Sequence, residues 1–135
     1  MKQTDTYSVA VSKEIHVSQA RQLGVKIAES LGFGKADCCI ISTSVSELAN
    51  NLIIHTFRGG SIFFRVLEKD DKKGIEIIAE DTGPGIRDID LSMRDGYSTC
   101  GGLGSGLGGV KRLMHEFEIT SEYGKGTCIT ARKWR

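Results

Sequence analysis

The sequence predicts an α+β fold in which helices cover one face of a mostly antiparallel sheet. Three segments repeat apolar residues at three- and four-residue steps, which is typical of amphipathic helices. These segments alternate with pairs of short strand-like segments that are joined by turns, and strands joined in this way pair antiparallel. With 135 residues, the chain is expected to form one domain, residues 1–135, around a single core.

The first half of the chain is predicted to hold one strand and two helices. Residues 7–12 alternate between apolar and polar side chains, as in a half-buried strand. Residues 17–31 have helical periodicity, and a Gly-Phe-Gly stop follows them. The second helix, residues 35–56, is apolar around more than one face. That breadth indicates a helix that is buried against the sheet.

The second half is predicted to hold two hairpins and a third helix. Strands are expected at residues 61–67 and 75–81, joined by a charged loop. The third helix is expected at residues 110–117, where four apolar residues share one face. Residues 118–123 and 127–131 then read as a final hairpin.

Composition excludes several classes of protein. Eighteen Lys and Arg residues against 17 Asp and Glu residues give a net charge of +1, which argues against nucleic acid or an acidic membrane surface as a partner. The only basic cluster, residues 132–135, is expected to be a solvated terminus. No apolar run is long enough to span a bilayer, and the N-terminus does not resemble a signal peptide. A cytoplasmic location is therefore expected.

Glycine is concentrated at two places that follow predicted strand or loop segments. Six of the 17 glycines fall between positions 101 and 109, and Asp81 is followed by a Thr-Gly-Pro-Gly turn. Glycine loses more conformational freedom on folding than other residues, so such a run needs a compensating gain. Close approach of backbone N–H groups to a phosphate, just before a helix begins, is the usual compensation.

Two familiar phosphate-binding motifs do not fit this glycine run. Residues 104–109 match GxGxxG, but a dinucleotide fingerprint must follow a hydrophobic strand, and the preceding residues 94–100 are polar. A Walker A loop also fails, because no Gly-Lys-Ser/Thr closes the run. A phosphate site at a helix start, without a P-loop lysine, remains.

Polar residues in the second helix point to the same chemistry. Glu47, Asn51 and His55 recur every four residues and therefore share one side of the helix. Because the rest of that helix is strongly apolar, this polar stripe is a candidate site. A lone histidine near a helix C-terminus is more often favoured by the helix dipole, so His55 is not assigned a catalytic role.

Four motifs in fixed order resemble those of the GHKL ATP-binding superfamily. Glu47 with Asn51 resembles its N box, residues 81–85 its first glycine box, residues 102–108 its second glycine box, and Thr127 its terminal threonine. Within the superfamily, the compact length and the segments 46–51 and 101–114 are similar to those of anti-sigma-factor serine kinases. The resemblance implies the Bergerat α/β sandwich, with three helices on one face of the sheet.

The resemblance also implies roles for individual residues, with ATP and Mg²⁺ as cofactors. Asp81 would accept a hydrogen bond from the adenine amine, Asn51 would ligate Mg²⁺, and Glu47 would act as the general base. The other implied nucleotide contacts are Gly83 and Gly85 under the base, Gly102, Gly104, Gly106 and Gly108 at the phosphates, and Thr127 through water. Leu103 and Leu107 lie within the same glycine box, and packing of the lid and the core is the favoured interpretation of their side chains. Residues 86–101 would form a mobile lid.

Structural alternatives stay open for each of these residues. Asp81 could simply cap a tight turn, Asn51 could be a buried amide bonded to backbone, and Glu47 could belong to a surface ion pair. Asn50 is the neighbouring candidate for the metal ligand, and Asn51 is preferred for its spacing from Glu47. Thr127 could be no more than the start of a strand.

The implied function is that of a protein serine/threonine kinase in a partner-switching module. Its substrates would be STAS-domain proteins of the stressosome, and the released kinase would bind and activate a PP2C-type phosphatase. A regulatory module that holds nucleotide without significant turnover is the alternative. A NAD-dependent oxidoreductase is disfavoured, because the context of its fingerprint is missing.

Overall fold

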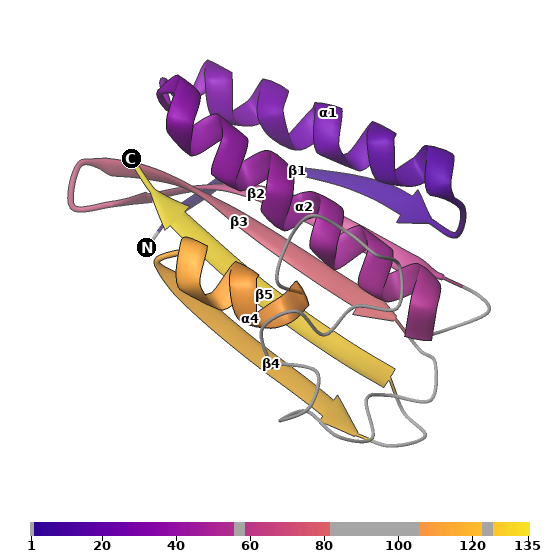
Figure 1. Ribbon diagram of the computed structural model, residues 1–135. Coiled ribbons are helices and arrows are strands. Elements are labelled where there is room, and N and C mark those ends of the chain that lie inside the picture. The colour runs from indigo at the N-terminus through magenta and orange to yellow at the C-terminus, as the bar shows by residue number, and fades with distance from the viewer. Residues whose placement is uncertain (1, 56–58, 82–105, 123–125) are drawn as a thin grey trace.

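In the part of the chain that the structure describes, three helices pack on one face of a five-stranded sheet (Figure 1). The computed structural model describes residues 2–55, 59–81, 106–122 and 126–135. The helices are α1 (Glu14–Ser30), α2 (Lys35–His55) and α4 (Gly106–Leu113). The strands are β1 (Lys2–Val11), β2 (Gly60–Lys69), β3 (Lys72–Asp81), β4 (Glu116–Glu122) and β5 (Gly126–Trp134).

The strands lie in the order β1-β2-β3-β5-β4, and each neighbouring pair is antiparallel. The predicted α+β architecture is therefore confirmed. Strand β3 lies in the centre and pairs with both β2 and β5, so its end at Asp81 is flanked by strands on both sides. This placement matters for the site, because an interior strand is held by hydrogen bonds along both edges.

The core fills the space between the sheet and the helices. Helix α2 contributes Val45, Leu48 and Leu52, each at most 1% exposed, against strand residues such as Phe64 and Ile77. Fully burying one such side chain stabilises the fold by about 1.5–3 kcal/mol. The prediction that the second helix is buried against the sheet is thus confirmed, and α2 carries part of the predicted site.

The prediction for the third helix was wrong at both ends. Helix α4 begins at Gly106, four residues earlier than predicted, and ends at Leu113. Phe117 belongs to β4, where it pairs with Ala131. Phe117 is half-buried in the strand and packs on the same core as Val110 of α4, whereas Leu113 is 38% exposed, so the four apolar residues do not share one buried helical face.

Two further expectations are corrected by the strands. Strand β1 starts at Lys2, although the polar N-terminal residues lacked a strand pattern. The basic cluster at the C-terminus is not a solvated tail, because it completes β5 down to Trp134. Lys133 is 5% exposed and Arg132 is bonded to Glu76, so backbone pairing overrides the polarity of these side chains. Among the described residues, no helix is long and apolar enough to cross a membrane.

Candidate functional site

The ends of two neighbouring strands bring Asp81 and Thr127 together. Strand β3 ends at Asp81, and β5 begins at Gly126. The last pair in the register of these strands joins Glu80 to Cys128, so Asp81 lies one step further along, opposite Thr127. Asp81 is 7% exposed and Thr127 is 4% exposed. Both polar side chains are thus held at one edge of the central sheet, away from bulk water.

Helix α2 crosses above this edge and carries the predicted polar stripe. Glu47 is partly buried and Asn51, one turn later, is buried. Gly60 shows how closely the helix and the strand approach: a Cβ on Gly60 would lie 2.9 Å from Leu52 Cδ2 and 3.0 Å from Asp81 Cβ. Because Leu52 follows Asn51 directly, the C-terminal half of α2 sits next to the end of β3.

Polar burial in this protein is concentrated at the predicted site. Asn51, Asp81 and Thr127 are half of the buried polar or charged residues in the described part of the chain. The full set is Ser44, Asn51, Glu76, Asp81, Thr127 and Lys133. Nδ2 of Asn51 is buried and has no hydrogen-bond partner among the described residues. A buried amide without a partner costs about 1–3 kcal/mol, which a polar ligand would offset.

The start of α4 faces the same end of the molecule as the end of α2 and the end of β3 (Figure 1). Gly106 has φ +67°, a left-handed conformation that glycine adopts without a steric penalty. The first N–H groups of a helix have no partners within the helix and carry partial positive charge. Gly106 and Gly108 are buried here, and Leu107 is 3% exposed in the core. The predicted phosphate-binding role of these residues fits this helix start.

The first residues of β5 include Thr127, whose hydroxyl is hydrogen-bonded, and Cys128, whose thiol has a raised pKa. The hydroxyl groups of Thr127 and Ser121 lie 2.9 Å apart, which fixes the Thr127 side chain against β4. Burial is the main reason that the pKa of the neighbouring Cys128 thiol is raised, and the carboxylate of Glu80 adds to the effect. Cys128 is therefore a neutral thiol near pH 7 and does not compete as a nucleophile.

Some predicted residues lie outside the described part of the chain. These are Gly83, Gly85, Gly102, Leu103 and Gly104, together with the lid at residues 86–101. The side chain of His55 is not described either. Lys111 and Arg112 are exposed in the last turn of α4 and therefore lie away from the helix start.

Sequence reasoning missed two residues that shape the site. From the sequence, no role was assigned to Gly60, and Ser121 was placed only within a predicted strand. Both act across strand pairs, Gly60 opposite Asp81 and Ser121 opposite Thr127. Their only signal in the sequence was position, namely a glycine at the start of one strand and a hydroxyl residue near the end of another.

The described residues contain no group of three or more His, Cys, Asp and Glu side chains that could hold a metal ion by themselves. An amide oxygen such as that of Asn51 is nevertheless a hard ligand of the kind that Mg²⁺ accepts. The residues present therefore fit a magnesium ion that is bound mostly by phosphate and water, with one protein ligand, and do not fit an all-protein metal cage.

Residues 40–134 match the family model described as "Histidine kinase-, DNA gyrase B-, and HSP90-like ATPase". The chain is 49% identical over 130 residues to the serine/threonine-protein kinase RsbT of Bacillus subtilis (strain 168), covering 96% of this chain and 97% of that protein. It is also 33% identical over 129 residues to the anti-sigma F factor of Caldanaerobacter subterraneus subsp. tengcongensis, covering 92% of this chain and 89% of that protein.

Solved structures share the fold at low sequence identity. The RsbU and RsbW domains of Rv1364c from Mycobacterium tuberculosis superpose with a TM-score of 0.63 at 17% identity, over 98% of this chain and 33% of that one. The SiaB-SiaC complex from Pseudomonas aeruginosa gives a TM-score of 0.56 at 7% identity, over 98% of this chain and 91% of the matched chain. These likenesses support the architecture alone.

Proposed function

Because the chain belongs to the histidine kinase-, DNA gyrase B- and HSP90-like ATPase family, we propose that it is an ATP-dependent protein serine/threonine kinase. This enzyme class agrees with the name of the Bacillus subtilis relative, which the chain matches over almost its whole length. The observation that carries the proposal is the burial of three polar residues from different elements, Asn51, Asp81 and Thr127. Asp81 lies opposite Thr127 at the paired ends of β3 and β5, and Leu52, the neighbour of Asn51, lies close to Gly60 next to Asp81.

Asp81 and Thr127 form the adenine end of the proposed site. The carboxylate of Asp81 accepts a hydrogen bond from the exocyclic amine, which distinguishes adenine from guanine. Thr127, held by Ser121, supports the base through a water molecule. Gly83 and Gly85 let the chain pass beneath the base; both remain predictions from the sequence.

The start of α4 forms the phosphate end. Backbone N–H groups of Gly106, Leu107 and Gly108 point along the helix axis toward the phosphates, where the helix dipole favours negative charge. Gly102, Leu103 and Gly104 extend this cradle as predictions from the sequence. No lysine is required, because the donors are backbone groups.

Asn51, buried on α2, would hold the magnesium ion through its side-chain oxygen. When bound, the ion neutralises the charge that develops on the phosphate oxygens.

Glu47 lies one helical turn before Asn51 and serves as the general base. It accepts the proton of a partner Ser or Thr hydroxyl as the hydroxyl oxygen bonds to the γ-phosphorus. The bond between the γ-phosphorus and the bridging β–γ oxygen breaks, and ADP leaves with its electron pair. The products are ADP and a phosphate ester on the partner, so atoms and charge balance.

The proposed substrates are STAS-domain proteins of a stressosome, and the proposed second partner is a PP2C-type phosphatase. Kinase and anti-sigma relatives along nearly the whole chain support a partner-switching role. In that role, phosphorylation releases the kinase from its substrate, and the free kinase activates the phosphatase.

The test uses γ-labelled ATP with Mg²⁺ and a STAS-domain protein from the same organism. Wild type should transfer label to a Ser or Thr of that protein. Glu47→Gln should lower the rate about a hundredfold or more, as expected for loss of a general base, while nucleotide binding persists. Glu29→Gln, an exposed glutamate on α1, is the matched control and should leave the rate unchanged.

Two results would decide against the kinase proposal in different ways. Nucleotide binding without any transfer of phosphate to the partner would exclude the kinase and support the alternative, a regulatory module that binds nucleotide. Absence of both nucleotide binding and phosphate transfer would exclude the proposed nucleotide site.

A further inference from the structure

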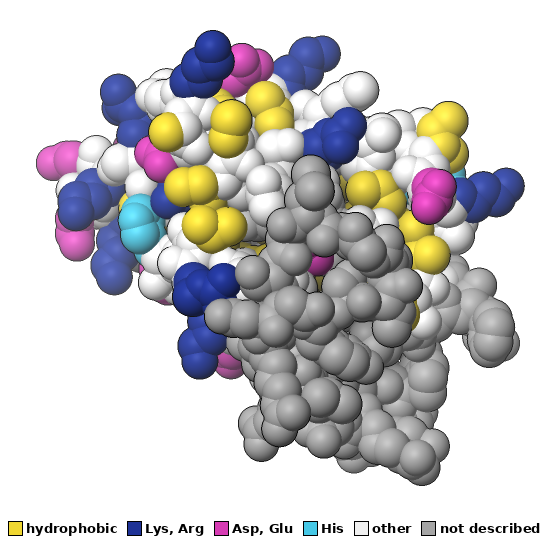
Figure 2. Space-filling view, viewed as in Figure 1, with side chains coloured by type: hydrophobic (Ala, Val, Ile, Leu, Met, Phe, Trp, Pro, Cys, Tyr) yellow, Lys and Arg dark blue, Asp and Glu magenta, His cyan; other side chains and the backbone are white. Residues whose placement is uncertain are grey.

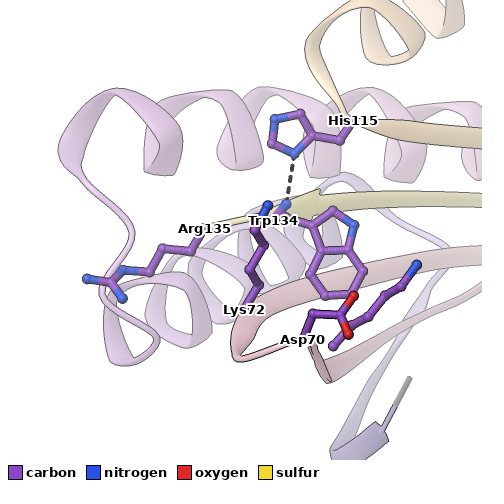
Figure 3. Close-up of a pocket in the computed structure, with 6 residues that line it drawn as sticks. Asp70, Lys72, His115, Trp134 and Arg135 are labelled. Carbon is purple, nitrogen blue, oxygen red and sulfur yellow. Dashed lines mark hydrogen bonds between the residues drawn. The ribbon is translucent and has the colours of Figure 1, made fainter.

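A cavity lies at the end of the sheet opposite to the candidate site. It has a volume of about 620 Å³ and is lined by Lys69, Asp70, Lys72, His115, Trp134 and Arg135 (Figure 3). We call it the hairpin cavity, because Lys69 and Lys72 close the β2–β3 hairpin. Its volume lies within the range of ordinary ligand pockets, about 300–1,000 Å³. The cavity and Asp81 lie at opposite ends of β3.

The hairpin fixes two positive charges side by side. Lys69 and Lys72 are paired directly across the two strands, an arrangement that is unfavourable for like charges. Between them, Asp70 and Asp71 have φ values of 52° and 66°, so both turn residues are left-handed. This tight turn holds the lysines together, although the chain as a whole has a net charge of only +1. Asp70 also lines the cavity and offsets part of this charge, and an anionic ligand would relieve the remaining repulsion between the lysines.

The indole of Trp134 forms one side of the hairpin cavity and is held by contacts with its neighbours. Its indole lies over Gly74, where a Cβ would come within 2.6 Å of Trp134 Cε3. The indole N–H donates to Glu116 Oε2, and the backbone N–H donates to His115 Nδ1 at 2.9 Å. Figure 3 shows the indole between Asp70 and His115, with the Arg135 side chain directed away from it. That guanidinium is bonded to the carbonyl of Gly32 at 2.9 Å, so it is not counted as a ligand group.

The surrounding surface carries charges of both signs. Figure 2 shows Lys and Arg side chains interspersed with Asp and Glu near a histidine, at the end of the molecule that holds the β2–β3 hairpin and the C-terminus in Figure 1. The charge of Lys69 contributes to the lowered pKa of Glu116, the carboxyl that accepts the indole N–H of Trp134. Lys69 therefore lies near a carboxylate that is already bonded to the indole.

We propose that the hairpin cavity binds an acidic segment of a protein partner. Carboxylates of the segment pair with Lys69 and Lys72, and an adjacent apolar side chain packs on Trp134. Only the choice of a protein as the ligand rests on the proposed kinase function. Nucleic acid fits less well, because two lysines and a near-zero net charge offer little compensation for a run of phosphates. A partner held here leaves the nucleotide site free.

The experiment uses Trp134 as its own reporter, since it is the only tryptophan in the chain. Selective excitation of tryptophan follows the titration of wild type, without nucleotide, with a short peptide of alternating Glu and Leu. The matched probe replaces each Glu by Gln. The acidic peptide should shift the emission, and added salt should weaken the binding. The Gln peptide should have little effect.

The double variant Lys69→Gln with Lys72→Gln should bind the acidic peptide about tenfold more weakly or worse, because two charge-assisted contacts are lost. Lys26→Gln with Lys35→Gln removes the same charge from exposed positions on α1 and α2, and should bind like wild type. Both double variants change exposed side chains, so both are expected to fold.

Several results would overturn the proposal. Equal binding of the Gln peptide would show that charge is not recognised, and an equal shift with inorganic phosphate would indicate a small-anion site. Tighter binding of a single-stranded oligouridylate would indicate a nucleic-acid site. No change in Trp134 emission would show that the cavity binds nothing of this class. A fluorescent ATP analogue, titrated into the same variants, reports on the proposed kinase site separately.

Discussion

A Cβ added to Gly60 would lie 3.0 Å from the Cβ of Asp81 and 2.3 Å from the carbonyl oxygen of Glu80. The glycine therefore sets the position of the carboxylate that is proposed to read adenine. Because the closest atom belongs to the backbone of β3, the strand must move if a side chain is introduced. This contact couples the packing of the sheet to the proposed nucleotide site.

Gly60→Ala should lower both stability and nucleotide affinity. Overpacking of this kind costs about 1–3 kcal/mol, and the shift of β3 displaces Asp81. Chemical denaturation measures the first effect, and titration with a fluorescent ATP analogue measures the second. Gly34→Ala is the control, because a Cβ there meets no atom within 4 Å. Its stability should change by less than about 0.5 kcal/mol, as for other surface changes, or increase. Equal effects of the two substitutions would contradict the account.

Asp81→Asn tests the adenine contact directly. Loss of a hydrogen bond to a charged group should cost about 1.5–3 kcal/mol, or roughly tenfold to hundredfold in affinity for ATP. Isothermal titration of ATP and GTP measures both the affinity and the preference for adenine. Asp71→Asn, in the exposed hairpin turn, is the matched control, since Asn also tolerates the left-handed backbone there. Unchanged ATP affinity in Asp81→Asn would exclude the assigned role.

Much of this site could be predicted because its residues lie on elements with strong local patterns. Glu47 and Asn51 share a helix with clear apolar periodicity, and Asp81 ends an alternating strand. Helical and strand periods alone therefore placed these residues on the correct elements. The family resemblance supplied the chemistry, and family membership is confirmed.

Features that depend on pairing between distant segments could not be predicted. Gly60 matters only because β2 pairs with β3 in the register that sets it opposite Asp81. Phe117 was assigned to a helix because its spacing from Val110 satisfies a helical period, although it packs on the same core from β4. Lys133 is buried because β5 continues along β3, which composition does not reveal.

The ionic contacts on the sheet face opposite the helices give a stability prediction. Arg132 Nε donates to Glu76 Oε2 at 2.6 Å, and the Glu76 side chain is only 4% exposed. Arg132→Met should destabilise the fold by about 3 kcal/mol, because it leaves a buried carboxylate with weak compensation. Adding Glu76→Gln should recover part of that loss. Urea denaturation of the single and double variants measures both effects.

Arg65→Met is the comparison for this prediction. Arg65 lies 3.4 Å from the other carboxylate oxygen of Glu76, but its side chain is 41% exposed. Exposed ion pairs contribute about 0–1 kcal/mol, so this variant should lose little stability. A loss of stability in Arg65→Met as large as that in Arg132→Met would contradict the prediction. It would show that the short hydrogen bond from Arg132 is not the main contact that stabilises the buried carboxylate of Glu76.

Acid should weaken the contact that anchors Trp134. The hydrogen bond from the Trp134 indole is the main reason that the pKa of Glu116 lies below its ordinary value of 4.5, with further help from Arg132 and Lys69. A lowered pKa in the folded state means that the unfolded chain binds the proton more readily. The stability that Glu116 contributes is therefore fully present above pH 4.5 and is lost as the pH falls through the lower folded-state value. Its side chain is 43% exposed, so the effect is small.

The difference in melting temperature between wild type and Glu116→Gln reports this contribution. It should be largest near neutral pH and should shrink as the solution is acidified below 4.5. Trp134 emission should shift over the same range in wild type, because the indole loses its charged acceptor, and should stay constant in Glu116→Gln. Glu29→Gln, on the exposed side of α1, serves as control. Its difference in melting temperature from wild type should not change over this pH range. A difference that stays constant across the acid range would mean that Trp134 and Glu116 do not share the proton-linked contact.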